Sequence, residues 1–214
     1  MLKLVMIVSA LPFVAAGFAA NAFGFRVLLR PDKVSLEVDV LMRKLLAQMQ
    51  REDIEIIYQK KQLWPNLSSG KLHLPASFKK SKKASHVGRA LQLLGVILLG
   101  EQQPEPVIWR EKMLKLGYTL PVFTLLVIAF AFLVGKMPSA VLFTIASASL
   151  GFTSVMLGLS MGVDKEAAHL MVDRVEKLRV LPRLSEEELV VAAIKASPWA
   201  ALMPGVFLKL TLKD

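Results

Sequence analysis

Three histidines are the first candidates in this chain for metal binding or acid–base chemistry. They are His73, His86 and His169, and they lie in three separate segments. None stands four residues from another, the spacing that lets two imidazoles on one helix face bind the same zinc ion. The chain has no cysteine, which excludes disulfides, thiolate zinc sites, iron–sulfur clusters and cysteine nucleophiles. We therefore expect no metal and no cofactor, with each histidine in a surface or packing role.

A further candidate is Glu101, which stands in front of Gln102 and Gln103. This carboxylate could belong to a hydrolytic site, but a polar helix end before Pro104 accounts for the same residues, and we favour that interpretation. The chain contains no phosphate-binding glycine-rich loop and no Gly-x-Gly-x-x-Gly, and its Gly-x-Ser-x-Gly, residues 158–162, lies inside a long apolar segment. A serine activated by a lysine stays open, because both residue types are common here and no pair stands out.

The element that would position any site is a long apolar segment, residues 116–163. It carries one charge, Lys136, beside Gly135 and Pro138, where a tight turn is expected. Twenty uncharged residues precede Lys136 and twenty-seven follow it. About 20 apolar residues of helix cross a bilayer core of about 30 Å. The segment therefore predicts a transmembrane helical hairpin with Lys136 at its tip.

The second helix of this hairpin carries a stripe of small residues on one face. They are spaced four, three, four and four residues apart: Ser147, Gly151, Ser154, Gly158 and Gly162. Small residues let helix backbones approach closely in lipid, so we expect this face to pack against other helices. A polar conduit would need ionisable groups at membrane depth, and this stretch has none.

Residues 4–25 form a second charge-free stretch, twenty-two residues long, behind Lys3. A secretory signal peptide would also fit, with Ala-Asn-Ala at residues 20–22 as its cleavage site. The apolar run is longer than a usual signal-peptide core, and small residues recur every fourth position at Ala16, Ala20 and Gly24. We interpret this stretch as a first membrane span that packs closely against another helix.

The region between these membrane segments predicts a small basic α+β unit. From Pro31 to Lys115 there are fifteen Lys and Arg against nine Asp and Glu. Ser35 is expected to cap an amphipathic helix, and residues 55–58 and 71–74 read as short strands. The apolar run 91–99 is too short to span, so we expect a buried or interfacial helix. Gly100 to Pro104 should end it, and Pro106 should keep the chain non-helical.

Four lysines form a basic cluster in this unit: Lys79, Lys80, Lys82 and Lys83. Contact with anionic lipid headgroups, binding of RNA and a solvated loop are the three interpretations. Only Phe78 stands near the cluster as an aromatic residue, whereas nucleic-acid surfaces interleave several. We therefore expect lipid contact and no nucleic acid, with about 1 kcal/mol per basic residue near an anionic surface.

The C-terminal part continues as amphipathic helices followed by an apolar tail. Residues 164–178 extend the hairpin's second helix or follow it, and Ser185 with Glu188 predicts a capped helix start. Residues 197–210 are apolar but contain Pro198 and Pro204, which favours an interfacial or re-entrant tail.

The order of these elements resembles the bacterial membrane-bound neutral zinc metallopeptidase family. The resemblance covers most of the chain, and its order matters more than any one motif. The matching segments are residues 35–46, 69–78, 85–96, 113–121 and 185–202. It implies a zincin-like fold with a His-Glu-x-x-His helix. Counted from Gly88 and Arg89, that motif would fall on Leu99, Gly100 and Gln103, and the family's third ligand, a glutamate, on Gly162.

None of these positions holds a zinc ligand, so the resemblance implies a peptidase-like fold that has lost its metal site. We predict a mainly α membrane protein in four parts: an N-terminal transmembrane helix (1–26), a basic α+β region (27–115), a transmembrane hairpin (116–163) and C-terminal amphipathic helices with an apolar tail (164–214). Its partners would be membrane lipids and other membrane protein subunits. The expected function is a non-catalytic scaffold, assembly factor or accessory subunit. The alternatives are a membrane hydrolase with an unusual site and an anionic-lipid-binding module.

Charge distribution predicts the orientation. With three spans, all basic residues except Lys3, Arg26 and Lys136 lie on one side, which is twenty-four of twenty-seven. The positive-inside rule places that side in the cytoplasm, or in the matrix or stroma of an organelle. We therefore expect an integral protein of a bacterial inner membrane or an organelle membrane.

Overall fold

The computed structural model describes residues 2–59, 71–135 and 138–203, which form mainly helices with two short strands. Within these ranges, three helices are long and apolar enough to cross a membrane. The first is α1 (Leu2–Ala19) with its continuations η1 (Ala20–Phe25) and α2 (Arg26–Leu28), and the others are α5 (Pro104–Val134) and α6 (Ser139–Leu178). Large apolar side chains point outward along them, for example Phe130 at 70% and Leu133 at 83% exposure. The predicted set of three long apolar helices is confirmed.

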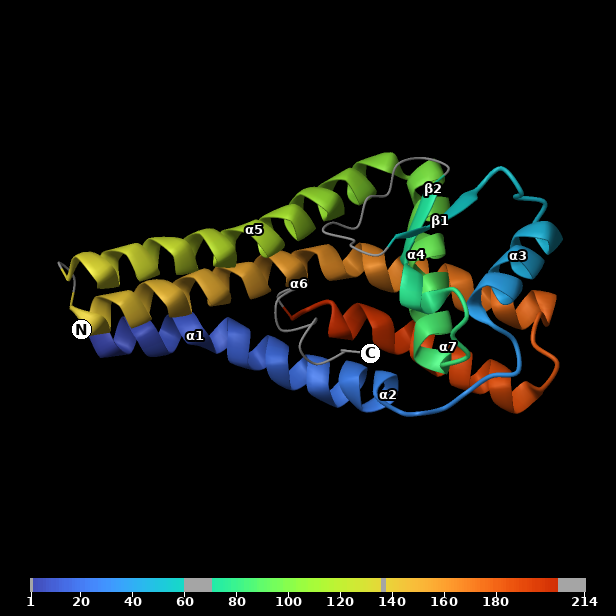
Figure 1. Ribbon diagram of the computed structural model, residues 1–214, viewed down its shortest axis with the longest axis horizontal. Coiled ribbons are helices and arrows are strands. Elements are labelled where there is room, and N and C mark those ends of the chain that lie inside the picture. Colours follow the sequence, from blue (N-terminus) through green and yellow to red (C-terminus); the bar gives the residue numbers. More distant parts are fainter. Residues whose placement is uncertain (1, 60–70, 136–137, 204–214) are drawn as a thin grey trace.

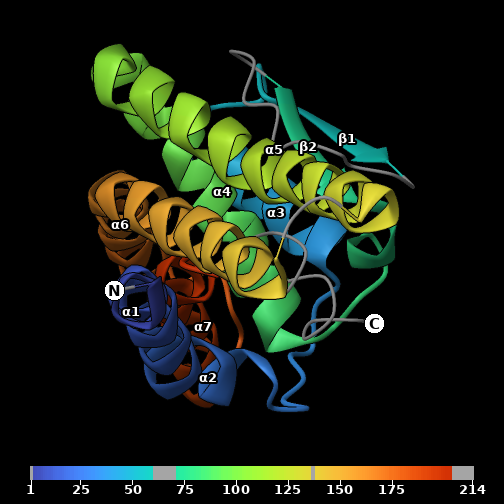
Figure 2. The ribbon, with the colours of Figure 1, turned by 90° about the vertical axis from the view of Figure 1, so that its left-hand side faces the viewer.

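The helix α6 lies between α1 and α5 and packs along both of them (Figures 1 and 2). Figure 1 shows that α5 runs antiparallel to α6, whereas α1 runs parallel to it. The N-terminus therefore lies at the end where α5 finishes and α6 begins. Gly135 closes α5 there in a left-handed conformation with φ of 67°, which glycine adopts without a steric penalty.

The contact between α5 and α6 recurs every seven residues on α5 and every seven or eight on α6. Three facing pairs mark it: Arg110 with Asp164, Gly117 with Leu157, and Thr124 with Ser149. A spacing close to seven residues is typical of helices that wrap around each other at a shallow angle. Thr124 Oγ1 and Ser149 Oγ lie 2.9 Å apart and form a hydrogen bond between the two apolar segments. The two helices are thus paired in one register over most of their length.

One residue, Gln103, separates α5 from α4 (Ala84–Gln102). Its backbone angles, φ −137° and ψ 82°, break the helix, and α5 begins directly afterwards. The expectation that Pro106 keeps the chain non-helical is wrong. Pro104 and Pro106 lie in the first turn of α5, where backbone N–H groups have no helical partner and proline is tolerated.

Beyond the long helices, the remaining elements pack with α4 and the last turns of α6 into a head (Figure 1). They are α3 (Val38–Gln48), β1 (Glu55–Gln59), β2 (Lys71–Pro75), η2 (Ala76–Phe78) and α7 (Leu184–Ala200). The largest fully buried side chains come from four helices and one strand, including Leu41, Leu72, Leu94, Met171 and Ile194. The two predicted strands pair in parallel, and the run 91–99 is buried inside α4.

The predicted cap of α3 is wrong. The cap position is Glu37, and Ser35 instead donates its hydroxyl to Glu186 Oε2 on α7 at 2.8 Å. The first N–H groups of α3 are satisfied by carbonyls of a distant loop, since the N–H of Val38 donates to Ser81 O at 3.0 Å. Carbonyl groups of a distant loop thus take the place of a side-chain cap at the start of α3.

Ser185 is not a cap either, because α7 begins one residue earlier, at Leu184, and its cap position is Arg183. The expected part boundaries at residues 115/116 and 163/164 fall inside α5 and α6. Each of these two helices therefore extends without interruption from the apolar segment into the head. Of the expected tail at 197–210, residues 204–210 lie outside the described residues.

Candidate functional site

Of the four positions expected for a degenerate zinc motif, Leu99 and Gly100 lie in an apolar setting and the other two are exposed. Leu99 is 2% exposed and belongs to a small cluster with Val96, Val107, Val163 and Ala167. A Cβ on Gly100 would lie 3.5 Å from the Val107 side chain. Gln103 is exposed and donates its amide to Glu166 Oε1 at 3.5 Å, and Gly162 is exposed on α6.

The three histidines remain apart in the fold. His86 stacks on the Phe78 ring at 4.3 Å between centroids, His73 lies in β2 opposite Ile57, and His169 is exposed on α6. Among the described residues, no three His, Asp or Glu side chains gather closely enough to hold a metal ion.

Glu101, the possible hydrolytic carboxylate, is held by an arginine. Arg51 donates two hydrogen bonds to it, with Nη1 2.7 Å from Oε2 and Nη2 2.5 Å from Oε1, and also binds both oxygens of Asp53. These hydrogen bonds, first to Asp53 and then to Glu101, raise the pKa of Arg51, and the same arginine lowers the pKa of Asp53. Both oxygens of Glu101 are engaged by the same guanidinium, so the geometry supports a structural role for this carboxylate.

The stripe of small residues on α6 divides into two halves. A Cβ on Gly151 would clash with the carbonyl oxygen of Ser9 on α1, so this glycine lets the two backbones touch. Ser154 is 4% exposed, and Ser147 is half-buried. Gly158 and Gly162, by contrast, are exposed, and a Cβ on either would meet nothing within 4 Å.

The four lysines Lys79, Lys80, Lys82 and Lys83 lie in the loop between η2 and α4, where the backbone caps α3. Lys79 Nζ lies 5.6 Å from the centre of the Tyr58 ring. Burial of that phenol, and then the nearby Asp39 carboxylate, raise the pKa of Tyr58. The contact of these lysines with anionic lipid stays a prediction.

A buried polar cluster that sequence reasoning missed joins three helices. Asp164 on α6 is 1% exposed, Arg110 on α5 is 3% exposed and Gln92 on α4 is 6% exposed. Asp164 Oδ1 lies 2.7 Å from Arg110 Nη2 and accepts hydrogen bonds from Arg110 Nε at 2.8 Å and Gln92 Nε2 at 2.6 Å. One carboxylate oxygen therefore ties the head helix α4 to both helices of the hairpin.

The chemistry open to this cluster is limited. A general acid or base must reach a substrate proton, but these side chains are almost fully buried and directed at one another. Removing one charge of a buried pair leaves the other uncompensated, which is strongly unfavourable. The arrangement is suited to holding three helices in one orientation. Arg110 escaped notice because it stands among exposed charged neighbours, Glu105, Lys112 and Lys115. The signal that could have revealed it is the seven-residue spacing to Gly117 and Thr124.

Comparison with protein-family models, with curated proteins and with solved structures gives no match for this chain. The resemblance to the zinc metallopeptidase family therefore rests on the order of sequence elements alone.

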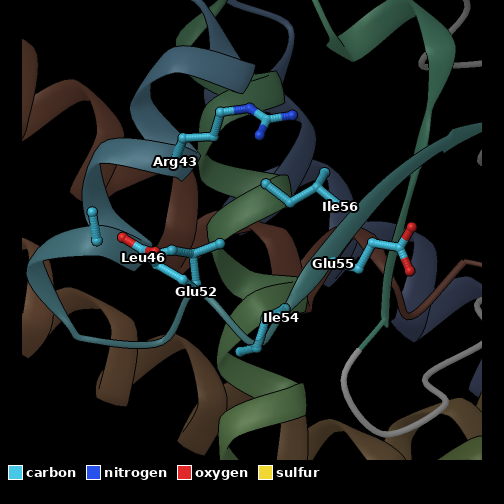
Figure 3. A pocket seen from close by; sticks show the side chains of 7 residues that line it. Arg43, Leu46, Glu52, Ile54, Glu55 and Ile56 are labelled. Atoms are coloured by element: carbon cyan, nitrogen blue, oxygen red, sulfur yellow. The ribbon is translucent and has the colours of Figure 1, made fainter.

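The head also carries a cavity of about 610 Å³ between α3 and β1 (Figure 3). Its lining combines apolar and charged side chains: Arg43, Leu46, Ala47, Glu52, Ile54, Glu55 and Ile56. Arg43 is engaged with Asp39 at 3.0 Å, and Glu55 lies 3.8 Å from Lys71. In the described part of the chain β1 pairs with β2 alone. A groove that combines apolar and charged side chains is suited to contact with another polypeptide.

Proposed function

We propose that the protein is an integral membrane scaffold that attaches a head to three spans and takes part in a larger membrane complex without catalysing a reaction. The observation that carries this proposal is the ion pair between two buried side chains, Arg110 and Asp164. Asp164 is bound by Arg110 and Gln92 from two other helices, which supports a structural role for this buried carboxylate.

The proposed orientation follows from charge. The head and the adjoining ends of α5 and α6 carry the basic surplus, which supports placement on the cytoplasmic, matrix or stromal side. Two tryptophans support the position of the bilayer boundary. Trp109 directly precedes Arg110, and Trp199 stacks against Lys165, which directly follows Asp164. Tryptophan is enriched at the headgroup level, so the buried ion pair would lie close to the membrane surface.

Purification in a mild detergent followed by native mass spectrometry tests the scaffold proposal. We expect assemblies heavier than one 23.6 kDa chain, with a partner present in stoichiometric amount. Glu52→Lys in the groove should reduce recovery of that partner, whereas Glu176→Lys, an exposed site on α6, should not. A chain that migrates alone under these conditions would overturn the proposal.

The non-catalytic part is tested separately. Purified protein should contain no stoichiometric zinc and should leave casein intact. Stoichiometric zinc together with chelator-sensitive cleavage would show a peptidase, and the degenerate-peptidase interpretation would then be wrong.

A further inference from the structure

The last residues of α7 pack against α1 where α1 is apolar. Ala200 and Leu202 share a cluster with Ala16 and Ala20, and a Cβ on Gly17 would lie 3.7 Å from Met203 Sδ. Gly17 stands nine residues before Arg26, the first charge after Lys3. This contact therefore lies roughly two helical turns from that charge. The C-terminal end of α7 therefore reaches the depth of the apolar segment.

The backbone of this end is arranged as a low-dielectric environment requires. The N–H groups of Ala201, Leu202 and Met203 donate to carbonyls of Ser197, Trp199 and Ala200 at 3.2 to 3.3 Å. Pro198 has no N–H group, and the Ser197 hydroxyl donates to Ala193 O at 2.8 Å. Lys195 is the last charged residue before Met203. Unsatisfied donors in lipid cost several kcal/mol each, and this segment leaves few of them.

Two aromatic residues, Trp199 and Phe23, lie where the C-terminal end of α7 meets the N-terminal span. The Trp199 ring receives Lys165 Nζ at 4.2 Å from its centre, and the Phe23 ring lies 4.7 Å away at 39°. Trp199 and Phe23 are both partly or largely exposed, so their remaining faces meet the surroundings. An indole that contacts both a cation and an apolar ring is typical of the boundary between headgroups and acyl chains.

We propose that residues 200–203 form a fourth membrane-embedded segment, which enters the leaflet facing the head part-way beside α1, with Trp199 at the headgroup boundary. The surface it offers is the half-buried side of this turn, Ala201 and Met203, and its partner is the lipid of that leaflet. The inference rests on the proposed membrane insertion of α1, α5 and α6. It gives the head two attachments: Asp164 with Arg110 on the α5 side, and the end of α7 on the α1 side.

The chain has no cysteine, so single-cysteine variants can be spin-labelled without altering a native thiol. We would label Ala201→Cys in lipid nanodiscs and compare its relaxation by oxygen, which concentrates in lipid, and by a water-soluble nickel chelate. Leu126→Cys, 63% exposed on α5, is the lipid control, and Glu188→Cys, exposed on α7, is the aqueous control.

Ala201→Cys should follow Leu126→Cys, with oxygen several-fold more effective than the nickel chelate. Stronger relaxation by nickel, or protection from both reagents, would overturn the inference, because the segment would then face water or be enclosed by protein. If Leu126→Cys itself responds to nickel, the proposed function fails as well. If Leu126→Cys responds as a lipid-facing site and Ala201→Cys does not, the fourth membrane-embedded segment is refuted and the proposed function stands.

Trp199 provides a second measurement that needs no label. In a Trp64→Phe, Trp109→Phe background its fluorescence should be quenched more by lipids brominated near the headgroup than by lipids brominated near the chain end. Efficient quenching by iodide with no effect of brominated lipid would contradict the proposal.

Discussion

Arg110 on α5 and Asp164 on α6 lie 2.7 Å apart, and both side chains are almost completely buried. Replacing Arg110 by methionine leaves the Asp164 charge buried without its cation. We expect this change to lower the free energy of unfolding by about 3–5 kcal/mol. Thermal or denaturant unfolding in detergent, followed by circular dichroism, measures the loss.

The matched control for this change is Arg43→Met. Arg43 forms an exposed pair with Asp39 at 3.0 Å, and such pairs contribute at most about 1 kcal/mol. A paired change, Arg110→Met with Asp164→Leu, should recover part of the lost stability. Equal losses for Arg110→Met and Arg43→Met would show that the buried pair does not hold the helices together.

Gly151 and Gly158 should respond in opposite directions to alanine. A Cβ at position 151 would clash with Ser9 O, so Gly151→Ala must push α1 away from α6 and destabilise the protein. A Cβ at position 158 meets nothing within 4 Å, so Gly158→Ala should be neutral or stabilising by up to about 1 kcal/mol through helix propensity. The melting temperatures of the two variants, compared with the wild type, decide the matter.

The hydrogen bond between Thr124 and Ser149 can be measured with a double-mutant cycle. Hydrogen bonds between membrane helices contribute about 0.6–2 kcal/mol, so Thr124→Val and Ser149→Ala should each destabilise modestly. Their coupling should account for most of each single effect, because the two hydroxyl oxygens lie 2.9 Å apart. Strictly additive effects would mean that the bond contributes nothing to pairing of α5 with α6.

Tyr58 should resist ionisation. A free tyrosine loses its proton near pH 10, but burial and the Asp39 carboxylate raise the pKa of Tyr58. In a Tyr118→Phe variant, Tyr58 is the remaining tyrosine, and its ultraviolet difference absorbance reports the titration. Between the two pKa values the folded state holds the proton that the unfolded state has released. The stability that this group contributes is therefore complete below about pH 10 and is lost as the pH rises toward the folded pKa. A phenolate that appears near pH 10 in the folded protein would contradict this account.

The long helices were predictable because an absence of charge over twenty or more residues is a strong signal that tertiary context rarely overrides. The strands at residues 55–58 and 71–74 were predictable for a related reason, since short apolar segments between turn residues are typical of strands. Both signals are local and need no knowledge of partners.

The joins between elements were not predictable from local signals. Ser35 and Ser185 have the side chains of helix caps, but the N–H of Val38 donates to Ser81 O, forty-three residues further along the chain. Arg110 has the sequence neighbourhood of a surface residue, and its burial depends on Asp164 and Gln92 meeting it from other helices. Likewise, Pro106 reads as a helix breaker until the start of α5 is known to lie two residues earlier.

The single-residue connection at Gln103 makes the two helices beside it mechanically dependent. A connection of one residue allows almost no independent movement of the two helices, so a rotation of α5 has to move the end of α4 with it. Helices longer than the local bilayer thickness accommodate by tilting, and α5 continues through thirty-one residues from Pro104 to Val134. With α5 inserted as proposed, a thinner bilayer would tilt α5 and turn the head with it, so the angle between head and membrane would depend on the lipid.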